Sequence, residues 1–439
     1  MKIYNYPSAS AEEKIIATLK RGLGFSKTDY KNVEAIIKDV KLRGDKALVE
    51  YTNRFDSDAV SESNLKVTER EFKQAEKNVN TKFLTALNRA TGQLEAFHEA
   101  QKENSWFDTP RNGVMVGQMV TPVGVAGIYA PGAKGGKTPL VSSVLMGGIP
   151  AKVAGVESVS LMTPPMKDGN INPCILVAAK RVGITSVFKA GSAWAIAALT
   201  YGTKQIPKAD VIVGPGNIYV TLAKKIVSGT VGIDMIAGPS EILIIADSSA
   251  DPEFIAADLL SQAEHDIRAS AVLVTDSESI AQQTQTALKN QIKKLPRRDI
   301  AEKAIKDFSY IMVVQNIDIA IELANRLAPE HLELLVKEPF EHIGQIKNAG
   351  AVFLGSYTPE PVGDYVAGPN HVLPTAGTAR FSSALSIQNF TKKTSIINYS
   401  KAAFKEESDD IITLAETEGL GGHANSIKIR KKLLIDSKN

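Results

Sequence analysis

The chain has very little cysteine. Cys174 is the single one among 439 residues, which excludes an internal disulfide framework and cysteine-based zinc fingers. Without thiolates, a zinc site has to be built from histidine and carboxylate or amide ligands. Histidine is scarce too, and the sequence has six: His98, His265, His331, His342, His371 and His423. The surroundings of these histidines are therefore the first place to look for chemistry.

Long apolar runs and an excess of one charge are also missing. No segment of the sequence approaches the roughly 20 uninterrupted apolar residues that span a bilayer. The opening stretch MKIYNYPSASAEEK lacks the apolar core of a signal peptide and the arginine-rich character of a transit peptide. The net charge of +3, with both signs interleaved, gives no polyanion-binding surface. We therefore expect a cytoplasmic enzyme with neither a membrane nor a nucleic-acid partner.

The spacing of apolar residues changes along the chain. The first hundred residues have helical stripes, which predict helices over about 27–51 and 69–101. From Val114 the residues alternate as in strands, and two blocks of short apolar runs separated by helical segments follow. This alternation is typical of βαβ units. It predicts an α/β fold with two doubly wound, incomplete Rossmann-like parallel sheets and helical segments at both ends.

The same patterns divide the chain into four segments. We expect a helical N-terminal segment over 1–110, a first α/β domain over 111–238, a second over 239–380, and a helical C-terminal tail over 381–439. The second domain ends in a stretch rich in Gly and Pro that also contains aromatic residues and histidine. A loop of this length and composition favours a functional role.

Two glycine-rich stretches resemble nucleotide-binding motifs without matching them. The stretch GAKGGKT, Gly132 to Thr138, has Pro131 where a phosphate loop needs its first glycine. The stretch GPGNIY, from Gly214, ends a predicted strand and opens a predicted helix, but Tyr219 occupies the third glycine position of the dinucleotide fingerprint. That turn can take a phosphate or serve as a tight connection, and the sequence leaves both open.

The stretch SQAEHD, Ser261 to Asp266, combines an amide, carboxylates and an imidazole at the end of an apolar helix. Asp251 is a plausible N-cap of this helix, and Pro252 occupies its first position. Gln262 and His265 are three residues apart, so they project from one side of the last turn. They can be two ligands of one metal or can cap the end of the helix.

Three further histidines have carboxylates beside or near them. In APEHLEL, Glu330 precedes His331 between a helix and an apolar strand, as suits paired proton transfers or a surface pair. The loop VGDYVAGPNHVLPT contains Asp364 and His371, and ETEGLGGHA places Glu418 five residues before His423. The four clusters together favour a metal site with acid-base groups.

Taken together, these stretches resemble the histidinol dehydrogenase family. The resemblance rests on IDMIAGPSEILIIAD, DLLSQAEHD, APEHLEL, GDYVAGPNHVLPT and ETEGLGGHA, which keep their order and approximate spacing over nearly the whole chain. It implies oxidation of L-histidinol to L-histidine with two NAD⁺, through an aldehyde that stays on the enzyme, with one Zn²⁺ per site. The zinc ligands that it implies are Gln262, His265, Asp364 and His423, and the catalytic pair is Glu330 and His331.

The resemblance also implies contacts to the substrate and the cofactor. The substrate contacts comprise Ser240, His371 and Glu418, together with His331 and the four metal ligands Gln262, His265, Asp364 and His423. NAD contacts are implied at Tyr129 and Asn217. Trp194 in GSAWAIAAL stands where many members have a Gln that helps to bind NAD, and its indole can stack on the cofactor instead.

The family resemblance implies a homodimer with an exchanged C-terminal region and a shared site, to which Glu418 and His423 contribute across subunits. Cys174 is expected to pack as a small apolar residue, because the reaction needs no thiol. Two alternatives stay open: a zinc-dependent dehydrogenase of another amino alcohol, and a non-catalytic metal-dependent binding protein. Zinc and manganese also stay open, because nitrogen and oxygen ligands suit both.

Overall fold

The computed structural model describes residues 1–133 and 138–436. The gap falls within the phosphate-loop-like stretch Gly132 to Thr138, whose middle lies outside the described residues. The chain forms two compact units, one of residues 1–101 and 123–390 and the other of residues 102–122 and 391–439. Each unit joins segments that are far apart in sequence, and the four continuous segments drawn from the sequence remain a proposal about domains. Among the described residues, no helix has the length and apolar character needed to cross a membrane.

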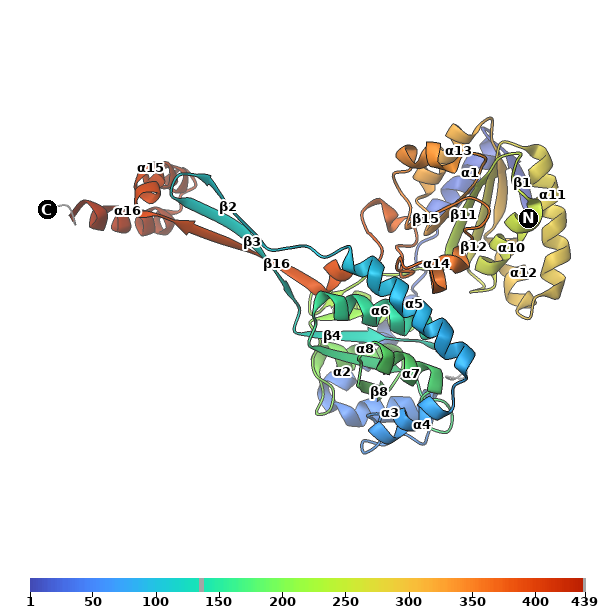
Figure 1. The fold of residues 1–439 in the computed structure, drawn as a ribbon, viewed down its shortest axis with the longest axis horizontal. Coiled ribbons are helices and arrows are strands. Elements are labelled where there is room, and N and C mark those ends of the chain that lie inside the picture. The colour runs from blue at the N-terminus through green and yellow to red at the C-terminus, as the bar shows by residue number, and fades with distance from the viewer. Residues whose placement is uncertain (134–137, 437–439) are drawn as a thin grey trace. The chain divides into compact units, whose positions relative to one another are not determined.

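The first unit contains two parallel sheets (Figure 1). The strands of the first sheet are β4 (Val125–Tyr129), β7 (Ser158–Thr163), β8 (Ser186–Lys189), β9 (Val211–Val213) and β10 (Gly232–Ile233). The strands of the second sheet are β1 (Lys2–Asn5), β11 (Glu241–Ala246), β12 (Ser270–Thr275), β13 (Tyr310–Val313), β14 (His331–Leu335) and β15 (Ala351–Leu354). A separate small pair is formed by β5 (Gly132–Ala133) and β6 (Thr138–Pro139).

The two parallel sheets are wound in the same way. The first has the order β10-β9-β4-β7-β8, and the second has the order β1-β13-β12-β11-β14-β15. In each sheet, the first strand of the block in which strands and helices alternate, β4 or β11, lies inside the sheet. The next two strands extend the sheet on one side and the following two on the other. The predicted α/β fold with two doubly wound parallel sheets is confirmed.

Helices cover both faces of the first sheet. They are α2 (Lys27–Arg43), α3 (Asp45–Phe55), α4 (Glu69–Lys77), α5 (Thr81–Glu99), α6 (Val141–Ala154), α7 (Pro173–Arg181), α8 (Ser192–Tyr201) and α9 (Ile218–Val227). Side chains alternate along each strand, so Val187 packs with α4 to α7 on one face, whereas Phe188 packs with α2, α3, α8 and α9 on the other. Both faces are apolar, as a parallel sheet covered on both sides requires.

The second sheet is covered in the same manner. Its helices are α1 (Ala9–Leu19), α10 (Pro252–Ala263), α11 (Glu278–Gln291), α12 (Arg298–Asp307), α13 (Ile317–Leu327) and α14 (Glu360–Tyr365). Single-turn or short 3₁₀ helices are η1 (Ile292–Lys294), η2 (Pro339–Gln345), η3 (Thr378–Arg380) and η4 (Ile387–Phe390). Ile244 packs under α10 to α12, and Leu243 packs under α1 and α13. As predicted, Asp251 caps α10, accepting a hydrogen bond from the backbone N–H of Glu253, and Pro252 opens it.

Several predicted helices are shorter than expected. The helix predicted over about 27–51 is broken by Gly44, whose φ of +57° favours glycine and ends α2. The helix predicted over 69–101 is interrupted before Asn80, whose side chain caps α5.

The second compact unit contains an antiparallel sheet that the sequence patterns missed. Its elements are β2 (Trp106–Arg111), β3 (Val114–Pro122), β16 (Thr391–Tyr399), α15 (Lys401–Thr417) and α16 (Gly421–Asp436). The order is β16-β3-β2, so β3 pairs on both sides. The N-terminal segment predicted to be helical therefore contains the strands β1 and β2, and the C-terminal tail contains β16. The strands β1 and β16 could not be recognised locally because their partners are distant in sequence. β2 was missed although it pairs with the neighbouring strand β3 across the two-residue turn Asn112-Gly113.

Candidate active site

The candidate site lies at the amino edge of the second sheet. β11 and β14 begin side by side there, with Ile242 paired to His331. The helix α10 ends at the same edge, because it runs back along the sheet after β11. Parallel sheets usually bind ligands at their carboxyl edge. Glu330 and His331 thus lie at the opposite edge of the sheet from the one at which parallel sheets usually bind ligands.

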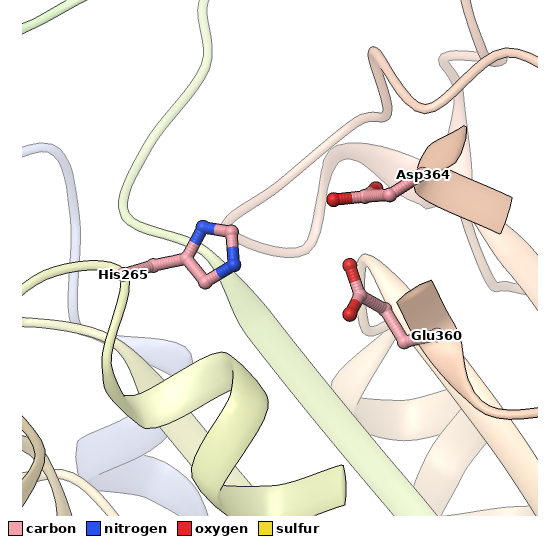
Figure 2. A group of neighbouring side chains, drawn as sticks. All are labelled: His265, Glu360 and Asp364. Atoms are coloured by element: carbon pink, nitrogen blue, oxygen red, sulfur yellow. The ribbon is translucent and has the colours of Figure 1, made fainter. Parts of the chain in front are cut away.

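Three side chains converge in a group that can hold a metal ion (Figure 2). One ligand atom from each of His265, Glu360 and Asp364 lies within 4.8 Å of the other two. His265 follows the end of α10, and both carboxylates come from α14, where they are four residues apart and so share a helix face. Nitrogen and oxygen donors of this kind suit zinc or manganese.

Gln262 lies in the last turn of α10, three residues before His265. The residue is 1% exposed, and neither Oε1 nor Nε2 finds a hydrogen-bond partner among the described residues. A buried amide without partners is costly, so its presence indicates a missing partner. A cation bound by Oε1 would supply that partner, and the predicted role of Gln262 as a metal ligand fits this environment.

The predicted catalytic pair, Glu330 and His331, is held by the backbone of one residue. Glu241, at the start of β11, donates its N–H to Oε2 of Glu330 at 2.8 Å and accepts from Nδ1 of His331 at 2.9 Å with its carbonyl. Because a carbonyl can only accept, Nδ1 of His331 carries the proton and Nε2 carries the lone pair. Gly350 lies against the pair, since a Cβ there would be 2.5 Å from the carbonyl oxygen of Glu330.

The free nitrogen of His331 faces the metal-binding group, with Nε2 3.8 Å from Oε1 of Glu360. Burial lowers the pKa of His331 to about 4, so the ring is neutral at neutral pH. Burial also raises the pKa of Glu330 well above its usual value, and the neighbouring carboxyls of Glu241 and Asp364 act in the same direction. The pair thus combines a neutral imidazole with a carboxyl whose pKa is raised.

Buried carboxyls lie beside the metal-binding group. Glu333 on β14 is 0% exposed, and its Oε1 accepts from the backbone N–H of Glu360 at 2.8 Å. Burial is the main cause of the raised pKa of Glu333, with Asp258 of α10 the nearest contributing charge. Burial also raises the pKa of Asp258 to about 6 and that of Glu360 to about 9. Such an accumulation of acids becomes less repulsive when a cation binds beside it.

His371 and Ser240 lie close to these groups. Nδ1 of His371 is 3.6 Å from Oδ1 of Asp364, and its buried Nε2 has no hydrogen-bond partner within the described part of the chain. The loop is anchored by Asn370, which donates to the carbonyl of Met146 in α6 at 2.7 Å. Ser240 directly precedes β11, and its carbonyl accepts from the N–H of Ser270. A cavity of 370 Å³ opens beside Asp364, lined mainly by apolar residues of α5 and α6.

Two predicted residues of the site belong to the other compact unit. Glu418 is the C-cap of α15, and His423 lies in the first turn of α16. Their roles as a substrate contact and a metal ligand stay predictions.

The three predicted NAD residues lie at the carboxyl edge of the first sheet. Tyr129 ends β4, Trp194 lies in the first turn of α8, and Asn217 caps α9 by accepting from the N–H groups of Tyr219 and Val220. Winding reverses between β4 and β9, and such switch points are the usual dinucleotide sites of α/β sheets.

Trp194 is engaged inside the core of the protein. Its indole is 5% exposed, stacks against Tyr51 and Phe55 at centroid distances of 5.9 and 5.4 Å, and donates to the hydroxyl of Thr52. An indole this deeply buried has little surface left for stacking on a cofactor.

Sequence reasoning missed three residues of the site. Glu360 could have been found from its i,i+4 spacing to Asp364, and Glu333 from its position within an apolar strand buried on both faces. Glu241 carries no comparable signal, because its backbone rather than its side chain contacts the catalytic pair.

Comparison with known proteins places the chain in a family. A family model described as histidinol dehydrogenase matches residues 21–431. The histidinol dehydrogenase of Desulfotalea psychrophila is 53% identical over 400 residues, covering 91% of this chain and 92% of that protein. That of Bacillus subtilis is 50% identical over 416 residues, covering 94% and 96%.

A solved structure agrees with these relatives. The crystal structure of histidinol dehydrogenase from Elizabethkingia anophelis matches with a TM-score of 0.93 at 41% identity, covering 99% of this chain and 98% of that one. The resemblance noted in the sequence motifs is confirmed, and the chain belongs to the histidinol dehydrogenase family.

Proposed function

We propose that the chain oxidises L-histidinol to L-histidine in two successive steps, with NAD⁺ as the oxidant of both and a zinc ion in the site. Family membership supports the reaction. The observation that carries the assignment to these residues is a neutral His331 whose lone-pair nitrogen faces a metal-binding group. The enzyme is an oxidoreductase of histidine biosynthesis, and we place it in the cytoplasm.

Gln262, His265 and Asp364 are the residues of this chain that hold the metal in our proposal. The orphaned amide of Gln262 and the convergence of His265 with Asp364 support them. When bound, zinc supplies a template and Lewis acid for the imidazole and amine nitrogens of histidinol. Glu360 lies against the same group and restrains Asp364, four residues away on α14.

His331 acts as the base of the first oxidation. Its Nε2 takes the proton of the substrate hydroxyl while the carbinol carbon loses a hydride, which leaves an aldehyde. The Nδ1–H···O bond to Glu241 fixes the tautomer that this step requires and becomes stronger when the ring is charged.

Glu330 acts as the base of the hydration step. Its carboxylate takes a proton from water as the water oxygen attacks the aldehyde carbon, and His331 returns the proton that it took in the first step to the former carbonyl oxygen. The resulting gem-diol then loses the second hydride. A raised pKa makes the ionised carboxylate a stronger base. The N–H of Glu241 holds one carboxyl oxygen, which leaves the other for the water.

The cofactor site that we propose is the switch point of the first sheet. Tyr129 and Asn217 flank it at the ends of β4 and β9, and the amino terminus of α9 suits a pyrophosphate. NAD⁺ supplies the hydride acceptor there. Trp194 contributes from the core by fixing α8 to α3.

We propose a homodimer in which Glu418 and His423 of the partner subunit complete each site. Mixing His423→Ala subunits with His265→Ala subunits tests this arrangement. Heterodimers should regain about half of the activity, since one of their two sites can be intact, and a random mixture of dimers about a quarter. Inactive heterodimers of confirmed composition would contradict the exchange.

Counting product against substrate tests the activity. Purified, zinc-loaded protein is incubated with NAD⁺ and L-histidinol, and NADH formed per histidinol consumed is measured. We expect two NADH and L-histidine. One NADH would indicate a simple amino-alcohol dehydrogenase, and none, with zinc still bound, would indicate a binding protein. The His331→Gln variant serves as the matched control, with zinc content retained and turnover lost.

A further inference from the structure

Glu241, the residue that holds the catalytic pair, also forms a buried ion pair with Arg21. The side chain of Arg21, just after α1, is 11% exposed, and that of Glu241 is 16% exposed. Their charged groups approach to 3.7 Å, which is too long for a good hydrogen bond and close enough for a strong attraction where water is excluded. Arg21 has a second neighbour in Phe308, whose ring centre lies 5.3 Å from the guanidinium carbon.

Arg21 has few other ways to satisfy its charge. Neither Nη1 nor Nη2 finds a hydrogen-bond partner among the described residues, and both atoms are buried. Burial is the main cause that lowers the pKa of Arg21, and Glu241 is the largest influence in the opposite direction. A guanidinium is rarely kept in such a place unless its charge acts on a neighbour.

Glu241 is fixed at four points. Its side chain faces Arg21 through Oε1 and accepts from the backbone N–H of Ala376 through Oε2 at 3.3 Å. Its backbone holds Glu330 and His331 at 2.8 and 2.9 Å. Any movement of Glu241 therefore moves both catalytic groups at once.

The segment that carries Arg21 is fastened independently. Arg268 donates to the carbonyls of Leu23 and Gly22 at 3.1 and 3.3 Å, which ties this segment to the turn before β12. The backbone next to Arg21 is thus held in place by Arg268, independently of Glu241.

We propose that Arg21 and Glu241 are positioning residues of the reaction: their buried ion pair fixes the first residue of β11, whose backbone sets the tautomer of His331 and the orientation of Glu330. Neither residue contacts the reacting atoms. The inference deepens the proposed function and rests on it for its kinetic test. The competing explanation is an ion pair that only fastens α1 to the sheet.

Four variants separate these explanations. Glu241→Gln keeps the shape and the acceptor for Ala376 but removes the charge, and Arg21→Met removes the other charge. We expect each to lower kcat about tenfold with the KM for histidinol and the zinc content unchanged, because small misplacements of catalytic groups are costly. Arg21→Lys keeps the charge and should restore most of kcat. The double variant should be no slower than the slower single one, because both remove the same pair.

The matched control is the ion pair between Glu12 of α1 and Arg326 of α13, whose side chains are 38% and 39% exposed. Glu12→Gln and Arg326→Met should leave kcat unchanged. The proposal is overturned if Arg21→Met and Glu241→Gln keep full kcat, if Arg21→Lys is as slow as Arg21→Met, or if the loss of kcat follows only a loss of folded protein or zinc.

A second readout does not need activity. The nitrogen chemical shifts of His331, identified with His331→Gln, report its tautomer. We expect an Nδ1–H imidazole in the unmodified protein and a mixture of tautomers in Glu241→Gln and Arg21→Met. An unchanged tautomer in both variants overturns the positioning role. Absent NADH formation by the unmodified protein instead refutes the proposed function, and the nitrogen shifts then decide the positioning role alone.

Discussion

The amide of Gln262 gives a prediction in which one substitution has opposite effects with and without metal. Gln262→Met replaces a buried side chain by an apolar one of similar size. In the metal-free protein it removes two buried polar atoms that have no hydrogen-bond partner among the described residues. In the metal-loaded protein it removes a proposed ligand.

The size of each effect follows from the structure. A buried unsatisfied group costs about 1–3 kcal/mol, so at the lower end two such atoms give about 2 kcal/mol. For a cooperative unit of roughly 150–250 residues this raises Tm by about 4–8 °C. Zinc at about a thousand times its Kd stabilises the unmodified protein by about 4 kcal/mol, and the variant should lose most of that increase.

Scanning calorimetry of chelator-treated protein, with and without added zinc, measures both effects. The order of the two Tm values should reverse when zinc is added. Gln283→Met on the exposed face of α11 is the control and should change neither value by more than about 1 °C. A lower Tm of metal-free Gln262→Met, or an undiminished response to zinc, would refute the reasoning.

Other substitutions test the surrounding groups. Burial raises the pKa of Glu333 above its unfolded value, so the folded protein holds a proton that the unfolded chain releases, and stability falls as pH rises above about 4.5. Glu333→Gln should thus gain in Tm over the unmodified metal-free protein between pH 5 and 9, and an equal or falling difference would contradict this. Glu360→Gln should weaken zinc binding about 10–100-fold in a competition assay with a chromogenic chelator, as the loss of a supporting carboxylate does; unchanged affinity would remove Glu360 from the site. Trp194→Phe keeps the stacking but loses the bond to Thr52, so it should cost about 1 kcal/mol in urea unfolding and change the Kd for NAD⁺ less than twofold; a large change in Kd would place the indole at the cofactor. Cys174→Ser should keep kcat within about twofold, because the half-buried thiol has no assigned step; a folded, inactive variant would overturn the thiol-free mechanism.

Sequence periodicity was sufficient for the two parallel sheets. Most of their strands are short apolar runs, bounded by helical segments and buried on both faces, so the signal is local. It failed for the edge strands β1 and β16, whose partners are distant in sequence. It also missed β2, although β2 pairs with β3 across the short turn Asn112-Gly113. Thr391 pairs with Pro122 across the antiparallel sheet, a separation that no local pattern reports.

The site could be predicted as far as side-chain chemistry marks it. His265 and Asp364 are residue types that commonly bind metals, and the structure brings them together with Glu360. Gln262 was supported by its spacing and by the family resemblance, and its unsatisfied amide became visible only in three dimensions. Arg21 and Glu241 are common surface residue types, and only burial distinguishes them.

The placement of β1 has a consequence for how the protein is made. Lys2 pairs with Tyr310, so β1 leaves the ribosome about 300 residues before its partner strand, a delay of roughly 15–60 s at usual translation rates. The first sheet, synthesised in between, can fold during that interval. Arg21 is likewise synthesised long before its ion-pair partner Glu241. Nascent chains stalled before β11 should therefore present both an unpaired strand and an uncompensated guanidinium, and chaperones that bind exposed strand edges should recognise them.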